Sequence, residues 1–173
     1  MKIRRALVSD KTTLYSLYKE VARNSGGIAR LEEEITDQYI ESLLESASKD
    51  VLMLLGLEEE TEEVIAEIHA FKYGIRIFDH ILTHLTLVVH PDFQGQGVGK
   101  RLLSSLLVEV QKNRPDIARI ELESRASNQK SIGLYQSTGF VQEGKMRNKT
   151  RNKDGSFEDS VLMAWTNPEF KNG

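Results

Sequence analysis

The chain has 173 residues and no cysteine, and its 23 lysines and arginines against 26 aspartates and glutamates give a net charge of −3. This length predicts a single domain over residues 1–173 with a core that needs no disulfide. The composition excludes a disordered chain and cysteine-based chemistry, and the acidic balance argues against nucleic acid as a partner.

Neither a membrane span nor a secretory signal is expected. The longest apolar run, Val51–Leu55, is much shorter than the roughly 20 residues that a spanning helix needs. The first residues, Met1–Arg5, lack the apolar stretch that follows the positive start of a signal peptide. A chain without cysteine is compatible with a reducing compartment, so we expect a cytoplasmic protein.

The first half of the chain alternates strand-like runs with amphipathic helices. A strand is predicted at Ile3–Val8, and a helix follows it in which Gly26 and Gly27 mark the end. The apolar positions of that helix are Leu14, Leu17, Tyr18 and Val21. The next predicted elements are a helix over Thr36–Ser46 and strands at Val51–Leu57, Val64–Tyr73 and Ile81–Val89.

The second half continues this alternation. Apolar residues from Val98 to Val110 recur at helical spacing, and Asn113-Arg114-Pro115 predicts the end of that helix. The remaining predicted elements are a strand at Ile117–Leu122, a helix at Asn128–Ser137 closed by Gly139, and strands at Met146–Arg151 and Ser160–Trp165 around a turn at Lys153-Asp154-Gly155. Interleaved strands and helices predict a mixed α/β domain.

A glycine-rich segment, His90–Arg101, joins the strongest strand to the most amphipathic helix. Its three glycines at alternate positions, Gly95, Gly97 and Gly99, allow a tight turn that brings N–H groups close to a ligand. Because a helix starts there, unpaired N–H groups and the positive end of the helix dipole point to the same place. The segment therefore predicts a phosphate or diphosphate site.

Two common phosphate-binding patterns do not fit this segment. The P-loop pattern needs glycine at Gln94 and serine or threonine at Arg101. The dinucleotide pattern needs G-x-G-x-x-G directly after the strand, whereas this loop reads G-x-G-x-G and begins after five further residues, His90–Gln94. Glu121 and Glu123 could still mimic the ribose-binding acid of that pattern.

The loop resembles the acetyl-CoA pyrophosphate loop of the GNAT superfamily of N-acetyltransferases through Val89-His90-Pro91 and Gln94-x-x-Gly97-x-Gly99. A second motif is similar to the other half-site of the family, especially in the ribosomal-protein alanine N-acetyltransferases. It consists of Glu123-Ser-Arg-Ala-Ser-Asn128, Ile132-Gly-Leu-Tyr135 and Gly139-Phe140. The resemblance covers about residues 85–140. It implies a GNAT-like fold, a central twisted and mostly antiparallel sheet of about seven strands flanked by about four helices.

The resemblance also implies transfer of the acetyl group of acetyl-CoA to a primary amine in a ternary complex. The backbone of Val88 and Val89 would bind pantetheine, and the Val89 N–H group would polarise the thioester carbonyl. The residues that would hold the diphosphate are Gln94, Gly95, Gln96, Gly97, Val98, Gly99 and Lys100. Asn128 would bind the pantetheine arm, although a helix N-cap explains this residue equally well.

Tyr135 is the implied general acid and would also contact the donor. A thiol has a pKa of about 8.5 and a tyrosine about 10, so the phenol can donate while it stays protonated at rest. Packing against Ile132 and Leu134 is the structural alternative. Glu123, twelve residues before Tyr135, is the implied general base. The alternatives are His84, a water held by Glu67 and His69, and water alone.

The acceptor stays open among peptide N-termini, lysines, polyamines, aminoglycosides and amino sugars. Lys145, Arg147 and Lys149 alternate along a predicted strand, so they form either a solvated basic face or the border of a negatively charged acceptor. The acceptor pocket is expected between the segment 26–35 and the late hairpin. Family members are commonly dimers, which implies a homodimer.

Metal and a purely binding function are the remaining alternatives. His80 and His84 have the spacing of a helical ligand pair, but strand geometry would separate their side chains, so no metal site is expected. A non-catalytic acyl-CoA-binding module would keep the glycine loop, and Tyr135 argues against it.

Overall fold

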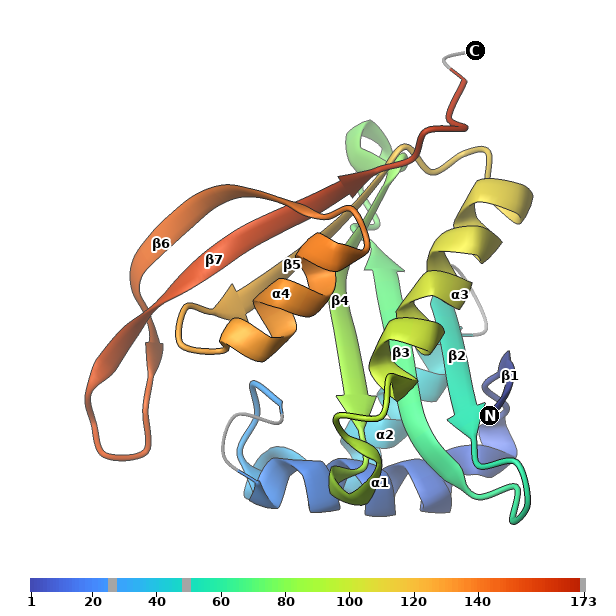
Figure 1. Cartoon of the computed structure of the whole chain (residues 1–173), viewed down its shortest axis with the longest axis vertical. Coiled ribbons are helices and arrows are strands. Elements are labelled where there is room, and N and C mark those ends of the chain that lie inside the picture. Colours follow the sequence, from blue (N-terminus) through green and yellow to red (C-terminus); the bar gives the residue numbers. More distant parts are fainter. Residues whose placement is uncertain (25–27, 48–50, 172–173) are drawn as a thin grey trace. The chain divides into compact units, whose positions relative to one another are not determined.

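The computed structural model describes residues 1–24, 28–47 and 51–171. Within them the chain forms seven strands and four α-helices (Figure 1). The strands are β1 (Lys2–Arg5), β2 (Leu52–Leu57), β3 (Val64–Lys72), β4 (Ile81–Val89), β5 (Arg119–Arg125), β6 (Val141–Arg151) and β7 (Phe157–Thr166). The helices are α1 (Lys11–Arg23), α2 (Asp37–Ala47), α3 (Val98–Asn113) and α4 (Gln129–Ser137).

The strand order is β1-β2-β3-β4-β5-β7-β6. The pairs β1–β2, β2–β3, β5–β7 and β6–β7 are antiparallel, and β4 pairs with β5 in parallel. A mostly antiparallel mixed sheet with interleaved helices confirms the predicted fold class.

The chain folds into two compact units. The first comprises Met1–Phe71 and Thr86–Val108, and the second comprises Lys72–Leu85 and Glu109–Gly173. β4 contributes its first five residues to the second unit and its last four to the first. The expectation of one functional domain over residues 1–173 stays a prediction.

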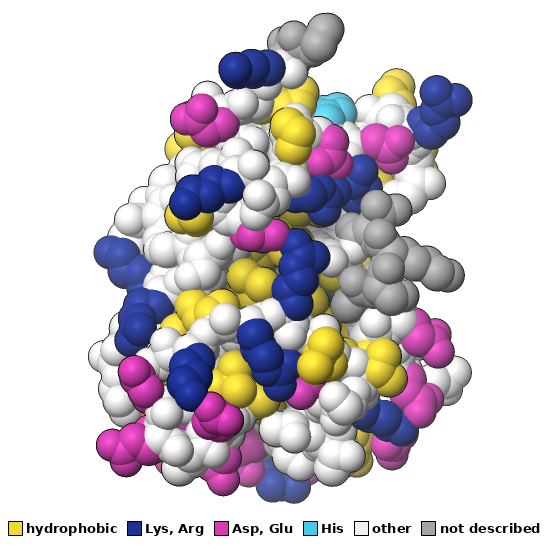
Figure 2. Space-filling view, turned by 90° about the vertical axis from the view of Figure 1, so that its right-hand side faces the viewer, with side chains coloured by type: hydrophobic (Ala, Val, Ile, Leu, Met, Phe, Trp, Pro, Cys, Tyr) yellow, Lys and Arg dark blue, Asp and Glu magenta, His cyan; other side chains and the backbone are white. Residues whose placement is uncertain are grey.

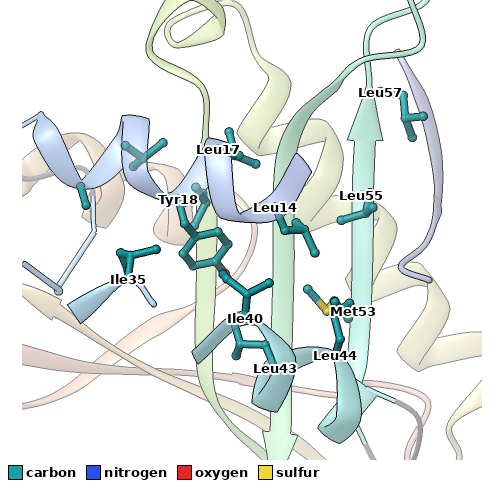
Figure 3. Close-up of a cluster of buried hydrophobic side chains, with 13 residues drawn as sticks. Leu14, Leu17, Tyr18, Ile35, Ile40, Leu43, Leu44, Met53, Leu55 and Leu57 are labelled. Atoms are coloured by element: carbon teal, nitrogen blue, oxygen red, sulfur yellow. The ribbon is translucent and has the colours of Figure 1, made fainter. Parts of the chain in front are cut away.

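The core of the first unit lies between its sheet and the helices α1 and α2 (Figure 3). Alternate residues of β2 point toward these helices, and all six of its residues are buried, so both faces of the strand are covered. The main side chains of this cluster are Leu14, Leu17, Tyr18, Ile35, Ile40, Leu43, Leu44, Met53, Leu55 and Leu57. The helical spacing in the sequence is thereby confirmed for α1 and α2.

The N-terminal strand ends earlier than predicted, at Arg5 rather than Val8. The Asp10 carboxylate accepts hydrogen bonds from Arg4 at 2.7 and 2.8 Å and from the Leu7 N–H group at 2.7 Å. These bonds draw Val8–Asp10 into a 3₁₀ turn that leads directly into α1. The turn is fixed by side-chain contacts over three and six positions, which a strand pattern does not indicate.

The end of α1 fits the prediction less completely. The helix ends at Arg23, and Gly26 and Gly27 lie outside the described residues.

α4 ends as expected, since Gly139 follows it with a φ of 95°, a left-handed conformation that favours glycine. None of the helices in the described residues has the length and hydrophobicity needed to cross a membrane.

β5 begins two residues later than predicted and continues through Arg125. Just before the strand, the Ala118 carbonyl accepts from the Asn167 N–H group and the Ile117 carbonyl accepts from the Asn167 side chain, both at 2.8 Å. Glu123 therefore lies inside the strand, opposite Leu162, rather than at its end.

The basic residues of β6 do not alternate on one face as expected. Between Met146 and Thr150 the register with β7 shifts, so that three residues stand opposite Asp159 alone. Asn148 in this bulge has a φ of 52°, and its N–H group donates to the Asp159 carboxylate at 2.9 Å. Arg147, Asn148 and Lys149 are all exposed, so the regular alternation predicted for this strand is wrong.

Candidate active site

The end of β4, which precedes the glycine loop, is held by a buried side chain and by a backbone hydrogen bond to β3. The Val88 side chain is fully buried and belongs to the α1–α2 core, whereas Val89 is half-buried. At the strand end the His90 N–H group donates to Ile65 of β3 at 2.8 Å. The start of the loop therefore has a defined position within the first unit.

Two of the three loop glycines have conformations that other residues rarely adopt. The φ angles are 76° at Gly95 and 80° at Gly97, whereas Gly99 lies within α3 and is not left-handed. A Cβ atom built on either Gly95 or Gly97 would meet nothing within 4 Å. Conformation rather than crowding thus requires these two glycines, and the space beside them within the described residues is open.

The loop ends in the N-terminus of α3. The Arg101 N–H group makes the first helical bond, to the Gly97 carbonyl at 3.0 Å. The amides of Val98, Gly99 and Lys100 come before it and have no intrahelical acceptor. The buried Val98 side chain anchors this turn, and Lys100 is exposed. Three amides, the positive end of a 16-residue helix and an adjacent lysine fit an anion such as a diphosphate.

Both glutamines of the loop hydrogen-bond to the loop itself. The Gln94 amide donates to the Val89 carbonyl at 3.0 Å, and the Gln96 amide donates to the Asp92 carbonyl at 2.8 Å. These contacts help to hold the loop in its observed conformation. The sequence did not reveal these contacts, because a side chain's choice of partner needs coordinates. The expected place of Gln94 and Gln96 at the diphosphate stays a prediction.

The residues of the second motif lie in the second unit. Asn128 is the N-cap of α4, and its side-chain oxygen accepts from the Ser131 N–H group at 3.1 Å. Glu123 is exposed on β5. The structural explanation offered for Asn128 is therefore confirmed, while its contact with a ligand stays a prediction.

Tyr135 is buried on α4, with 7% of its surface exposed. Its ring lies 5.7 Å from that of Phe140, the residue that follows the helix-closing glycine. Burial raises the pKa of Tyr135 to about 12. The phenol is consequently protonated at neutral pH and can act as a hydrogen-bond donor.

The alternative bases have contrasting surroundings. His84 is exposed and has a φ of 53°, so the regular alternation that would place it on the face of the buried Val88 is interrupted. Glu67 and His69 are buried on β3, with Nδ1 of His69 3.0 Å from Oε1 of Glu67. The Tyr18 hydroxyl donates to the same carboxylate at 2.6 Å.

Tyr18 is a polar partner that the sequence did not reveal. Its position on the apolar face of α1 predicted a core residue, and the ring is indeed part of the core. The hydrogen bond joins residues 49 positions apart, so no local pattern could indicate it. The bond satisfies a buried carboxylate, which would otherwise be costly.

On the face shown in Figure 2, lysine and arginine side chains are interspersed with aspartates and glutamates. Among residues 1–24, 28–47 and 51–171 no group of three or more histidines or acidic residues could hold a metal ion.

A known protein matches about half of the chain. Over 82 residues the chain is 42% identical to the [ribosomal protein bS18]-alanine N-acetyltransferase of Escherichia coli K12, a match that covers 47% of this chain and 53% of that protein. The chain thus spans about half the length of the relatives it matches.

Two solved structures share the fold. The acetyltransferase of the GNAT family from Streptococcus pneumoniae has a TM-score of 0.86 at 23% identity, and the match covers 95% of this chain and 98% of that one. A GNAT superfamily phosphinothricin acetyltransferase from Sinorhizobium meliloti, in complex with acetyl-CoA, has a TM-score of 0.80 at 19% identity over 98% of this chain and 90% of that one. The model of the acetyltransferase (GNAT) family matches residues 12–140, and the chain belongs to that family.

Proposed function

We propose that this chain is an N-acetyltransferase that transfers the acetyl group of acetyl-CoA to a primary amine by direct attack in a ternary complex. The observation that carries the proposal is the start of α3, where a loop that requires Gly95 and Gly97 presents the amides of Val98–Lys100. Family membership and the complex of a structural relative with acetyl-CoA support the same donor.

In the reaction, the amine nitrogen bonds to the thioester carbonyl carbon, the carbon–sulfur bond breaks, and the amine loses one proton while the thiolate gains one. The backbone of Val88 and Val89 would align pantetheine, and the Val89 N–H group would stabilise the developing oxyanion. Glu123, exposed on β5, is our proposed general base for the amine.

Tyr135 would act on the leaving sulfur. With a pKa of about 12, its phenol is a weaker acid than a thiol of pKa about 8.5, so complete proton transfer to the thiolate is unfavourable. We infer that Tyr135 stabilises the sulfur mainly by donating a hydrogen bond, and that the proton released by the amine neutralises the thiolate.

An acceptor screen tests the proposal. Release of free CoA thiol would be followed across amine classes, including a peptide with an N-terminal alanine, the group named for the Escherichia coli relative. We expect turnover with at least one class. Binding of acetyl-CoA without turnover on any amine would favour a non-catalytic acyl-CoA-binding module instead. The homodimer and the cytoplasmic location stay predictions.

A further inference from the structure

The turn between β5 and α4, residues 125–128, carries Asn128 to its place at the helix N-terminus. The Asn128 N–H group donates to the Arg125 carbonyl at 3.0 Å, so the backbone of Arg125 sets the position of the cap. Asn128 is the residue predicted to bind the pantetheine arm of the proposed donor, and neither that prediction nor the proposed function gives a role to Arg125 or Ser127 of the same motif.

A carboxylate of β7 holds both of these side chains. Oε2 of Glu158 accepts a hydrogen bond from the Ser127 hydroxyl at 2.6 Å, and Oε1 lies 3.6 Å from Nη1 of Arg125. Between them the Ala126 N–H group donates to the main-chain carbonyl of Asp159 at 2.8 Å. The turn is thus fixed to β7 at three successive residues.

The Glu158 contacts are partly shielded from water. The Glu158 side chain is 16% exposed and that of Arg125 28%, and Nε of Arg125 is buried without a hydrogen-bond partner among the described residues. Hydrogen bonds to a charged group are stronger than neutral ones, and partial burial reduces screening by salt. Loss of the carboxylate would leave Ser127 without its acceptor and Arg125 without its counter-charge.

From these contacts we infer that Glu158 is a positioning residue for the pantetheine arm of acetyl-CoA, acting through Ser127 and Arg125 on Asn128. The inference rests on the proposed function. It also gives a role to a residue thirty positions after Asn128, on a strand that the sequence analysis connected only with the acceptor.

Calorimetric titration with two ligands tests the inference. Acetyl-CoA contains the pantetheine arm, whereas 3′-phosphoadenosine 5′-diphosphate carries the diphosphate without it. Glu158→Gln removes the counter-charge of Arg125 but keeps one oxygen that can accept from Ser127. For this variant we expect acetyl-CoA affinity to fall about three- to tenfold, the range of one weakened hydrogen bond, with little change for the shorter ligand. Ser127→Ala, a substitution at an exposed residue, should give a smaller loss in the same direction.

Glu143→Gln is the matched control. Glu143 on β6 also pairs with an arginine of β5, at 2.8 Å from Nη1 of Arg119, but at the end of the strand remote from the turn. The Glu143→Gln variant should bind acetyl-CoA and the shorter ligand with the affinities of the original chain.

The possible outcomes separate the inference from the proposed function. Unchanged acetyl-CoA affinity in Glu158→Gln and Ser127→Ala, or equal losses for both ligands, would overturn the positioning role alone. If the unaltered chain bound no acetyl-CoA, the proposed function would fail and the inference with it.

Discussion

At Tyr135 a single phenol group links the proposed chemistry to the stability of the fold. The ring is almost completely buried and packs near Phe140, while its hydroxyl is the proposed donor to the leaving sulfur. Removing the hydroxyl leaves the ring in place, so kinetic and structural contributions can be measured separately.

The substitution Tyr135→Phe should lower turnover about 10²-fold or more, the typical effect of one positioned donor or acid. Acetyl-CoA affinity should change little, because the backbone of the first unit supplies most of the proposed contacts. Steady-state kinetics with titration of the donor would show both. Tyr73→Phe is the control, since Tyr73 is exposed and donates to Glu121 at 2.9 Å. Unchanged turnover in Tyr135→Phe would refute the assigned role.

The pKa of Tyr135 predicts a loss of stability in alkali. Below about pH 10 the phenol is protonated in both the folded and the unfolded chain, so its full contribution to the free energy of unfolding is present. Above that pH the unfolded chain releases the proton while the folded chain, with a pKa of about 12, retains it. Unfolding then becomes more favourable, by about 1.4 kcal/mol at about pH 11.

Urea unfolding of the original chain and of Tyr135→Phe at about pH 8 and about pH 11 measures this contribution. The fall in unfolding free energy between the two pH values should be smaller in the variant by about 1.4 kcal/mol. Equal falls in both proteins would show that the phenol does not have a raised pKa.

At the scale of elements, the loop before α3 depends on left-handed glycine. In Gly97→Ala the φ of 80° costs about 1–2 kcal/mol, and the free loop can avoid this cost by changing its conformation. Acetyl-CoA would then have to restore the binding form, so its affinity should fall about tenfold. The thermal shift produced by acetyl-CoA should decrease accordingly.

Gly155→Ala is the control for this substitution. Gly155 lies in the turn between β6 and β7 with a φ of 86°, and an added Cβ atom meets nothing within 4 Å, so alanine should have a similar cost of about 1–2 kcal/mol without weakening donor binding. If Gly97→Ala bound acetyl-CoA as tightly as Gly155→Ala, the observed loop conformation would not be the one that binds.

The connection of β1 to α1 depends on Asp10. The hydrogen bonds from Arg4 lower the pKa of the Asp10 carboxyl below its usual range. The stabilisation from Asp10 is therefore complete above about pH 4, the usual pKa of the unfolded chain. It is lost as the pH falls through the lower pKa that the carboxyl has in the folded chain. Asp10→Asn should cost about 1.5–3 kcal/mol at neutral pH by chemical denaturation. Asp37→Asn, at an exposed ion pair, should cost about 0–1 kcal/mol. Comparable costs for both would contradict the structural role of Asp10.

For the whole molecule, the sequence predicted the number and order of elements because periodicity and glycine positions are local signals. Ile81–Val89 and the start of the helix at Val98 were predicted with their observed bounds. The early end of β1 and the bulge at Asn148 depend on the side chains of Asp10 and Asp159, which bond to backbone N–H groups three and 11 positions away. The contact of Asn167 with the Ile117 carbonyl before β5 joins residues 50 positions apart.

At the candidate site, too, the sequence predicted the local features and not the contacts between distant residues. The glycine loop and the cap at Asn128 follow from backbone rules, so the sequence was sufficient to predict them. The contacts of Tyr18 with Glu67 and of Ser127 with Glu158 join residues 49 and 31 positions apart. Such pairs carry no periodic signal, and their chemistry becomes visible only in three dimensions.

A crystal structure of the chain with acetyl-CoA tests the central claim most directly. Phosphate oxygens of the donor should lie about 3 Å from the backbone nitrogens of Val98, Gly99 and Lys100, with Gly95 and Gly97 left-handed. A diphosphate bound elsewhere, with these amides turned away from it, would contradict the account.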